Sequence, residues 1–412
     1  MDVVYRCCCG LDVHKDSVTA CVLWAESGGK NRQEKRKFAT FTRQLLELLE
    51  WLRQCGVTHV VMESTGIYWK PVWHVLEGHF ELLLANAQHV KAIPGKKTDR
   101  RDAGWLAELL QHGLLRGSFV PPEPIRGLRD LTRYRVNLAQ ECNRIANRIQ
   151  KVLEDANIKL ASVATDPLGV SGRAMLKALV KGEQDVEKLA EMSRGLLRRK
   201  IPQLQLALEG RVTEHHRFLL RELLDHLEFV ESKMGKLETE IAARLAPFQD
   251  QIKRLCEVPG INCVSAWGII SEIGLDMNQF PDAAQLASWA GLCPGNWESA
   301  GKRQSGRTRK GSPWLRRHLC QSAWGVSTKQ NNYLSALFRR LAGRRGVKRA
   351  TIAVAHALLV IAYHILKTQA HYHELGADHF DRLHPERLTR RLVKRLEGLG
   401  FQVTVTPISV SA

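Results

Sequence analysis

Acidic residues are missing from a long stretch in the second half of this 412-residue chain. Between Ser299 and His373 there is not one Asp or Glu, whereas Lys and Arg are frequent. The whole chain carries 61 Lys and Arg against 42 Asp and Glu, a formal net charge of +19. An excess of this size favours a polyanionic partner, either a nucleic acid or an anionic membrane surface. The 44% of hydrophobic residues is ordinary for a soluble globular protein.

The sequence has no long uninterrupted apolar run. Its most apolar stretch, Ala350–Leu366, is shorter than the ~20 residues that a spanning helix needs and contains His356 and His364. It therefore predicts a buried helix. Met1 is not followed by a charged segment and a long apolar run, so no signal peptide is expected. We expect a cytoplasmic protein without a membrane partner.

Paired C-x-x-C units are absent, although the chain has 10 cysteines. This argues against a zinc site, and unpaired thiols fit a reducing cytoplasm. Internal repeats and low-complexity tracts are absent as well. The length predicts two or three domains.

Strand and helix signals alternate over the first ~115 residues, which predicts an α/β domain. One helix is expected from Thr42 to just before Gly56, and another over Asp99–Leu110. The predicted strands are Val3–Val13, Ser17–Trp24, Arg36–Thr40, His59–Met62 and Glu81–Ala85.

The run Pro121–Pro124 predicts a linker after this domain. Beyond it, two series of apolar residues follow alternating three- and four-residue steps, the heptad pattern of helices that pack along a narrow seam. An antiparallel pair within one chain and an intermolecular coiled coil both fit this pattern. The two series are Leu128, Leu131, Leu138, Cys142, Ile145, Ile149 and Val152, then Leu220, Leu223, Leu227, Val230, Met234, Leu237 and Ile241.

Four acidic residues stand where a metal site could form. Asp12 ends the first strand, Glu63 follows the strand Val60–Met62, and Asp99 and Asp102 are three residues apart, so a helix would place both on one face. Each alone could be a turn former, a helix cap or the partner of a neighbouring arginine. Together, in a basic protein, they favour a site for hard divalent cations that also leaves room for phosphate.

Two segments in the second half indicate phosphate binding. The first, Asn296–Arg307, combines hydroxyl residues, glycines and cations, so a serine there could grip or attack a phosphate. Its cations and those that follow are Lys302, Arg303, Arg307, Arg309 and Lys310. The second is the Pro-Gly turn that contains Gly260. This turn points backbone N–H groups at a helix N-terminus and resembles a helix-hairpin-helix turn, although an ordinary turn between helices also fits.

The order of motifs resembles the DEDD transposases of bacterial insertion-sequence family 110. The blocks that carry the resemblance are G-L-D-V-H-K (10–15), M-E-S-T-G-I-Y (62–68), K-T-D-R-R-D-A (97–103), E-V-P-G-I (257–261), W-A-G-L-C-P-G-N (289–296), E-S-A-G-K-R (298–303) and R-K-G-S-P-W-L-R-R (309–317).

This resemblance implies a RuvC-like domain of RNase-H-like fold at residues 1–118, with Asp12, Glu63, Asp99 and Asp102 as magnesium ligands. A helical coiled-coil region for oligomerisation would follow at 125–250. A mainly α transposase domain, with a helix-hairpin-helix-like element, would span 251–375, and a basic tail 376–412.

The resemblance also implies a serine that attacks DNA and forms a phosphoserine link. It maps onto Ser299, while Ser305 lies close by in a block that departs from the usual serine-serine-glycine pattern. The implied partners are donor and target DNA, a guide RNA and further copies of the chain, as a homodimer or homotetramer.

Two other functions remain open at this point. One is a junction-resolvase-like endonuclease that uses the carboxylates and metal-activated water without a serine. The other is a DNA-binding protein without catalysis that uses the basic half alone.

Overall fold

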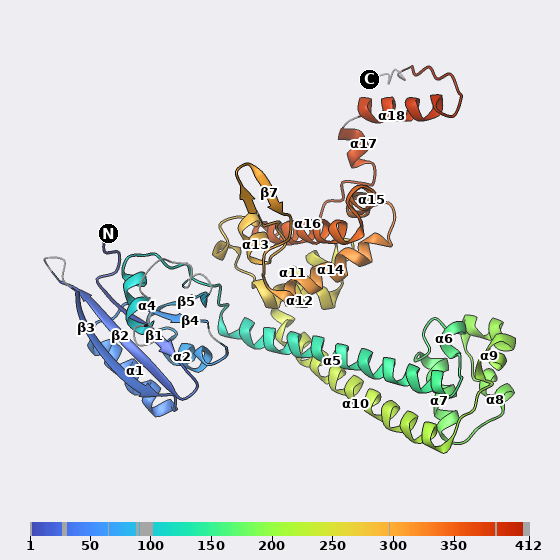
Figure 1. The fold of residues 1–412 in the computed structure, drawn as a ribbon, viewed down its shortest axis with the longest axis horizontal. Helices are drawn as coiled ribbons and strands as arrows, with labels where there is room; N and C mark the ends of the chain where they lie inside the picture. The colour runs from blue at the N-terminus through green and yellow to red at the C-terminus, as the bar shows by residue number, and fades with distance from the viewer. Residues whose placement is uncertain are drawn as a thin grey trace. The chain divides into compact units, whose positions relative to one another are not determined.

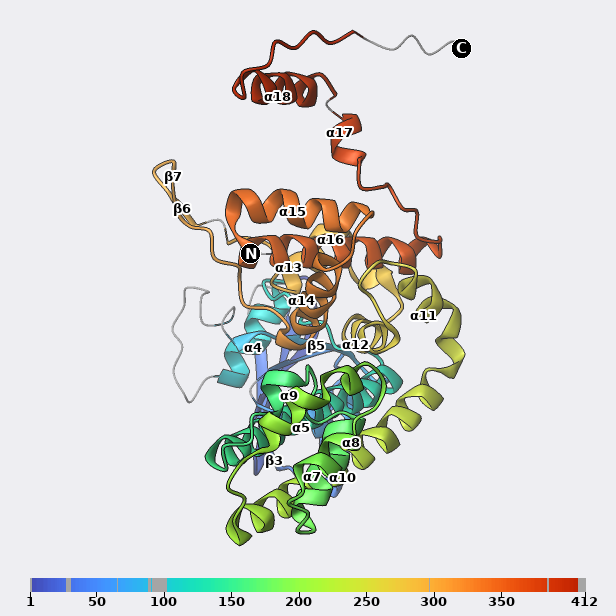
Figure 2. The same ribbon diagram turned by 90° about the vertical axis from the view of Figure 1, so that its right-hand side faces the viewer.

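The computed structural model describes residues 2–26, 31–64, 66–87, 90, 102–295, 297–383 and 385–406. Two compact units divide the chain, Met1–Val120 and Pro121–Ala412. Figures 1 and 2 show a mixed α/β arrangement in the first unit and almost only helices in the second.

The first unit is built on one five-stranded sheet with the strand order β3-β2-β1-β4-β5. Strands β1, β2 and β3 pair antiparallel, whereas β1, β4 and β5 pair parallel, so the three parallel strands end at the same edge. The strands are β1 (Cys7–Val13), β2 (Ser17–Ala25), β3 (Asn31–Ala39), β4 (His59–Glu63) and β5 (Glu81–Ala85).

Helices cover both faces of this sheet: α1 (Thr42–Gln54) and α2 (Trp69–Leu76) on one face, and α4 (Asp102–Gln111) on the other. Because side chains alternate along a strand, Cys9 and Leu11 pack with the α1 core, while Cys8 packs with Leu106 and Leu110 of α4. Apolar burial on two faces fixes the register of β1, since a slip of one residue would exchange its faces.

Strand β3 is longer than the predicted Arg36–Thr40. All nine residues from Asn31 pair with β2, although most of them are polar and exposed. The strand lies at the edge of the sheet, so a buried apolar alternation, the signal on which the prediction relied, is weak there. Of the helix predicted over Asp99–Leu110, the structure describes Asp102–Gln111, and Asp99 lies outside the described residues.

The predicted linker at Pro121–Pro124 is wrong for its second half. Helix α5 (Glu123–Asp155) begins inside the proline run, with Pro122 as its N-cap and Pro124 in the first turn. Proline is tolerated there because the first N–H groups of a helix have no intrahelical acceptor.

Helix α5 pairs antiparallel with α10 (Glu214–Arg244) within the same chain. Arg135 of α5 donates to Glu238 of α10 at 2.8 Å, and further along the pair Asp155 of α5 contacts His216 of α10 at 2.9 Å. The two heptad-like series thus meet inside one chain. Leu224, rather than the predicted Leu223, is the more deeply buried leucine at its turn of α10.

A lobe of short helices closes the far end of this pair (Figure 1). It shares one core with the ends of α5 and α10, which includes Ile149, Met175 and Leu204. Its elements are α6 (Leu160–Val163), α7 (Val170–Val180), α8 (Val186–Glu191), the 3-10 helix η1 (Gly195–Lys200) and α9 (Ile201–Leu208).

The rest of the second unit is a helical bundle interrupted by one β-hairpin. Its elements are η2 (Ala246–Phe248), α11 (Gln249–Cys256), α12 (Cys263–Ile273), η3 (Met277–Gln279), α13 (Ala283–Trp289), β6 (Trp297–Ser299), β7 (Lys302–Ser305), α14 (Pro313–Ser327), α15 (Tyr333–Arg345) and α16 (Val347–Thr368).

Helix α16 contains the most apolar stretch of the chain. With 22 residues it is long and apolar enough to cross a membrane by length and composition alone. However, Val354, Leu358, Ala362 and Tyr363 are buried, and the Tyr363 hydroxyl donates to the carbonyl of Phe280 at 3.0 Å. The helix contacts α13, α14 and α15 and is the core of the bundle, as the sequence predicts.

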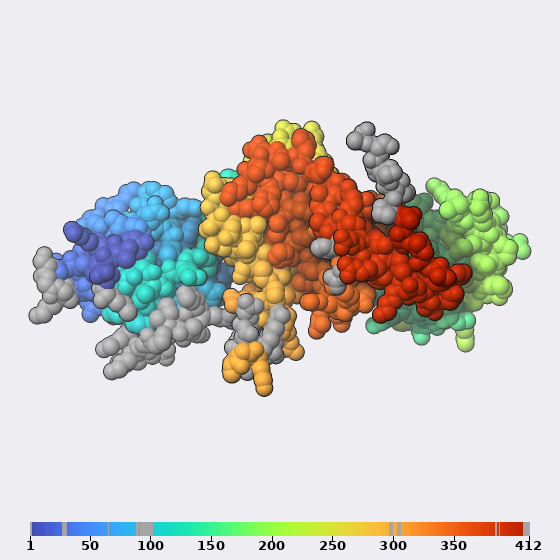
Figure 3. Space-filling model, turned by 90° about the horizontal axis from the view of Figure 1, so that it is seen from above, coloured from blue at the N-terminus to red at the C-terminus, as the bar shows by residue number. Residues whose placement is uncertain are grey.

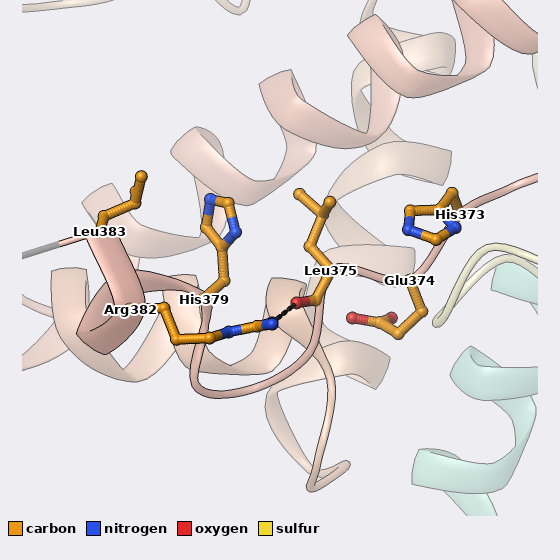
Figure 4. A pocket seen from close by; sticks show the side chains of 6 residues that line it. All are labelled: His373, Glu374, Leu375, His379, Arg382 and Leu383. Carbon is orange, nitrogen blue, oxygen red and sulfur yellow. Dashed lines mark hydrogen bonds between the residues drawn. The ribbon is translucent and has the colours of Figure 1, made fainter. Parts of the chain in front are cut away.

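The tail after α16 is attached to the bundle at its start. Glu374 accepts from the backbone N–H of Tyr333 at 2.7 Å, and Arg382 donates to the carbonyl of Leu375 beside a pocket of about 360 Å³ (Figure 4). Helices α17 (His379–Leu383) and α18 (Pro385–Glu397) follow and lie on the outside of the unit (Figure 3). Helix α18 lies within the predicted basic tail, and residues 401–406 after it form no regular secondary structure.

Candidate carboxylate site and serine hairpin

Two of the predicted metal ligands lie at the carboxyl ends of adjacent parallel strands. Leu11 of β1 pairs with Met62 of β4, so Asp12 and Glu63 are the next residues on the two strands. Asp12 lies four residues after Cys8 and Glu63 two residues after Val61, and both Cys8 and Val61 pack against α4. Because side chains on a strand point to the same face at every second residue, both carboxylates lie on this face. Both are half-buried, with the Asp12 side chain 26% exposed. The sheet therefore presents two neighbouring carboxylates on its α4 face.

Gly10 brings a third carboxylate to the same face. A Cβ atom at Gly10 would lie 2.2 Å from the carbonyl oxygen of Ala103 and 2.6 Å from the backbone nitrogen of Ala107. Only glycine permits this approach of α4 to β1. Asp102, the first residue of α4, precedes this contact directly, and the glycine in the G-L-D-V motif thus sets the position of Asp102 over β1.

The surroundings of Asp102 fit a bound cation. Its Oδ1 atom is buried and has no hydrogen-bond partner among the described residues. A buried carboxylate oxygen without a partner is costly, and a divalent cation would satisfy it. Within the described part of the chain, however, no three Asp, Glu, His or Cys side chains are already gathered as a metal site. Asp99, the fourth predicted ligand, lies outside the described residues.

His14 is a residue of this site to which sequence reasoning gave no role. Its Nε2 atom lies 3.2 Å from Oδ2 of Asp12, so the ring donates to the carboxylate when Nε2 carries the proton. The turn His14–Asp16 between β1 and β2 brings the ring back over the strand end. The sequence signal for this role was that His14 follows Asp12 by two residues, because a strand end and a tight turn can place two such side chains on the same side.

The predicted nucleophile Ser299 is the last residue of β6, at the tip of a two-stranded hairpin. Ser299 pairs with Lys302, and only Ala300 and Gly301 connect the strands, with φ of 50° and 73°. Positive φ at both turn residues is the type I′ pattern of tight hairpins, and an alanine there is strained. Ser305 pairs with Trp297 at the other end of the hairpin. The two candidate serines therefore occupy opposite ends of the same element.

Close backbone contacts fix the base of the hairpin. A Cβ atom at Gly311 would lie 2.3 Å from the backbone nitrogen of Gly291, and one at Gly291 would lie 2.7 Å from the nitrogen of Gly311. Between this contact and the hairpin, Pro294 and Thr308 form an isolated antiparallel β-bridge. The N–H of Gly295 donates to the carbonyl of Arg307 at 2.7 Å. The hairpin projects from the helical bundle in Figure 1.

Cations surround the hairpin. Lys302, Arg307, Arg309 and Lys310 are exposed, and Arg303 pairs through its backbone with Glu298 across the strands. Four exposed positive charges on one short segment can neutralise neighbouring phosphates of a nucleic acid backbone.

The Pro-Gly turn joins α11 to α12, which fits both the helix-hairpin-helix-like turn and the ordinary turn between helices that the sequence leaves open. Gly260 has φ of +93°, and a Cβ atom there would lie 2.5 Å from the carbonyl oxygen of Ser322 on α14. The turn thus packs against α14, and α12 begins three residues later with Asn262 as its N-cap.

A buried ionic network that the sequence did not reveal lies at the start of α14, the helix that follows the hairpin in the chain. Glu272 of α12 is 1% exposed and accepts from Nε and Nη2 of Arg133 at 2.7 and 2.9 Å. It also accepts from the hydroxyl of Ser312, the N-cap of α14, at 3.1 Å. Arg129 donates to the Glu272 carbonyl, and burial lowers the pKa of this arginine to about 10. The network joins α5, α12 and α14.

Comparisons with known proteins show the family of this chain. The family model DEDD_Tnp_IS110, described as a transposase, matches residues 9–158, and the model of the transposase IS116/IS110/IS902 family matches residues 252–339. Together they match more than half of the chain.

Two curated bacterial relatives are similar over most of their lengths. A "Probable family 20 transposase" of Pseudomonas aeruginosa is 28% identical over 347 residues, which are 83% of this chain and 90% of the relative. A "Putative transposase y4pF/y4sB" of Sinorhizobium fredii is 24% identical over 337 residues, 80% of this chain and 78% of the relative. The chain belongs to the IS110 family of transposases.

Proposed function

We propose that this transposase cuts and rejoins DNA with two sets of residues, the carboxylates of the first unit and Ser299 of the second. The observation that carries the proposal is that Asp12 and Glu63 lie side by side at the carboxyl ends of β1 and β4, on the face of the sheet that α4 covers, and that α4 begins with Asp102. Family membership makes DNA the substrate.

The carboxylates would hold magnesium, with Asp99 as a fourth ligand. Oxygen ligands are what this ion prefers, and the unpartnered Oδ1 of Asp102 fits such a role. Bound magnesium would supply charge stabilisation at the attacking and leaving oxygens. His14 would keep the Asp12 carboxylate oriented through its hydrogen bond to Oδ2.

Ser299 would attack the DNA phosphorus through Oγ, form a phosphoserine link and release a deoxyribose hydroxyl. Its place beside the two-residue turn supports this role, because a hairpin tip can approach a DNA backbone where a sheet interior cannot. Lys302, Arg303, Arg307, Arg309 and Lys310 would neutralise neighbouring phosphates, and the turn at Gly260 would contact the backbone.

The family resemblance further suggests that a guide RNA pairs with donor and target DNA, and that the active species is a dimer or tetramer in the bacterial cytoplasm. The antiparallel α5 and α10 pair, with exposed Phe218 and Phe229 on α10, is the proposed surface for assembly.

Replacing Ser299 with alanine tests the nucleophile. The variant should lose recombination and the covalent protein–DNA adduct on a denaturing gel while it binds DNA as the unmodified chain does. Ser305→Ala is the matched control and should retain the adduct. Full adduct formation by Ser299→Ala would contradict the assignment, and cleavage without any adduct would favour a resolvase-like reaction with water.

A further inference from the structure

A pocket of about 370 Å³ lies where α5, α12 and α14 meet, away from the serine hairpin. Its lining includes Arg135 of α5, Asn262 and Val264 at the start of α12, and Arg317 and His318 of α14. The function proposed above gives the Gly260 turn, which leads into α12, a contact with the DNA backbone, but it assigns no role to the side chains of this pocket.

The start of α12 offers free hydrogen-bond donors to the pocket. The Asn262 side chain accepts from the N–H of Ser265 at 2.8 Å and so caps one donor of the first turn. Among the described residues, no hydrogen bond is formed by the N–H groups of Cys263 and Val264. These groups and the positive end of the helix dipole favour an anion.

His318 is an independent sign of a ligand. The residue is only 6% exposed, it lines the pocket, and neither ring nitrogen has a hydrogen-bond partner in the described part of the chain. Buried polar side chains are nearly always hydrogen-bonded, so a polar ligand would complete its environment. Burial lowers the pKa of His318 to about 4, so the neutral ring can donate one hydrogen bond without adding a charge.

Arg317 provides the positive charge of the pocket. It is half-buried and forms no hydrogen bond or ion pair with any described residue. The charge of Arg135, in contrast, is already shared with Glu238, and the nearby carboxylate of Glu272 is neutralised by Arg133. A guanidinium and unpaired N–H groups at one pocket suit phosphate, which accepts several hydrogen bonds at once.

We propose that this pocket binds one phosphate group of a nucleic acid backbone, through Arg317, His318 and the first N–H groups of α12. The proposal rests on the chain acting on nucleic acid and adds a contact point independent of the catalytic residues. Because only backbone atoms of the nucleic acid would be bound, the contact should position the strand without reading its sequence.

The test measures duplex DNA binding as a function of salt concentration, without magnesium and in the Ser299→Ala background so that no chemistry contributes. Arg317→Gln should weaken binding about tenfold at every sequence and reduce the slope of log K against log salt by about one. Arg317→Lys keeps the charge and should keep the slope. Arg148→Gln removes one exposed charge from α5 and should leave the slope unchanged.

A second variant removes a donor without changing charge. Cys263 is the first residue of α12, and Asn262 before it has an extended backbone, so proline fits at this position. Cys263→Pro should weaken binding several-fold with an unchanged salt slope, whereas Cys263→Ala should have no effect. Thermal melting of each variant establishes that it is folded.

Three results would overturn the proposal. One is an unchanged slope for a folded Arg317→Gln, another is an equal loss of slope in Arg148→Gln, and the third is binding of inorganic phosphate as tight as that of duplex. The last would make the pocket a site for free anions. If Ser299 forms the adduct and these results are still found, only the pocket assignment fails, and the catalytic proposal stands.

Discussion

The carboxylate edge and the serine hairpin are built in opposite ways. At the carboxylate edge, helices cover β1 and β4 on both faces, and Asp12 and Glu63 are residues at the carboxyl ends of these strands. Ser299 stands instead in a three-residue strand whose one partner, in the part of the chain that the structure describes, is β7. Ligands that must surround a cation need a rigid scaffold, whereas a nucleophile that must reach a DNA strand gains from a projecting hairpin.

The two regions have one structural feature in common, a close backbone contact that only glycine allows. Gly10 lets α4 approach β1, and the pair Gly291 and Gly311 closes the base of the hairpin. Gly10 stands two residues before Asp12, and Gly291 and Gly311 flank the hairpin that carries Ser299.

The largest expected effect separates metal chemistry from DNA binding. Asp12→Asn keeps the size of the side chain but removes a charged metal ligand, so cleavage should fall at least about a thousandfold. DNA binding through the hairpin should be unchanged. A strand-cleavage assay and a binding titration on the same sample measure both quantities. If Asp12→Asn cleaved normally, the carboxylate edge would have no catalytic role.

The glycine contacts should matter nearly as much. Gly10→Ala would push α4 from β1 and displace Asp102, and Gly311→Ala would open the hairpin base. A displacement of about 1 Å at either place should reduce recombination about a hundredfold. Gly325→Ala is the control, since a Cβ atom there meets nothing within 4 Å. Only the first two variants should also lower the melting temperature. Normal activity in both would contradict the claim that these glycine contacts position Asp102 and the hairpin.

A pH effect should be confined to the helical unit. Burial lowers the pKa of His318 to about 4, whereas the unfolded chain has the ordinary histidine value of about 6.5. Between these values the unfolded state binds a proton that the folded state does not, so stability falls as pH decreases from 6.5 to 4. The loss from this group should approach about 3 kcal/mol.

Urea unfolding at several pH values, followed for the unmodified chain and for His318→Gln, measures this contribution. The variant should show a smaller decrease in stability over the same pH window. Equal pH dependence in the two proteins would mean that His318 is protonated in the folded state.

The smallest effect concerns the turn beside Ser299. Ala300 adopts φ of 50°, and glycine at this position should stabilise the hairpin by about 1 kcal/mol. Ala300→Gly should retain the adduct if the strain has no catalytic role. A rise in melting temperature together with a strong loss of adduct would show instead that the strained turn holds Ser299 in its reactive position.

Much of this arrangement could be predicted from the sequence because its signals are local. The apolar runs that end at Asp12 and Glu63 predicted two strands, and the structure has β1 and β4 at these places. The patterns from Leu128 and from Leu220 predicted the two helices, but only part of their buried face. Thr132, Val136 and Leu224 are buried, whereas the prediction placed Leu131, Leu138 and Leu223 on the seam. Spacing alone also could not show that the two helices pair within one chain.

Other features depend on contacts that no local pattern records. The approach of α4 at Gly10 and the burial of Glu272 between two arginines join segments that are far apart in the chain. The contact between His14 and Asp12 is local, but it depends on how the turn after β1 folds back. The start of α5 inside the proline run was missed because proline, usually read as a break, is also favoured in the first turn of a helix.

The central claim is that DNA becomes linked to Ser299 in a reaction that needs the carboxylates. Its most direct test is to trap the protein–DNA adduct in the presence of magnesium, digest both components and locate the modified residue by mass spectrometry. The account predicts a nucleotide on the peptide that contains Ser299, and no adduct from Asp12→Asn. A nucleotide on Ser305, or an adduct that forms equally well in Asp12→Asn, would contradict it.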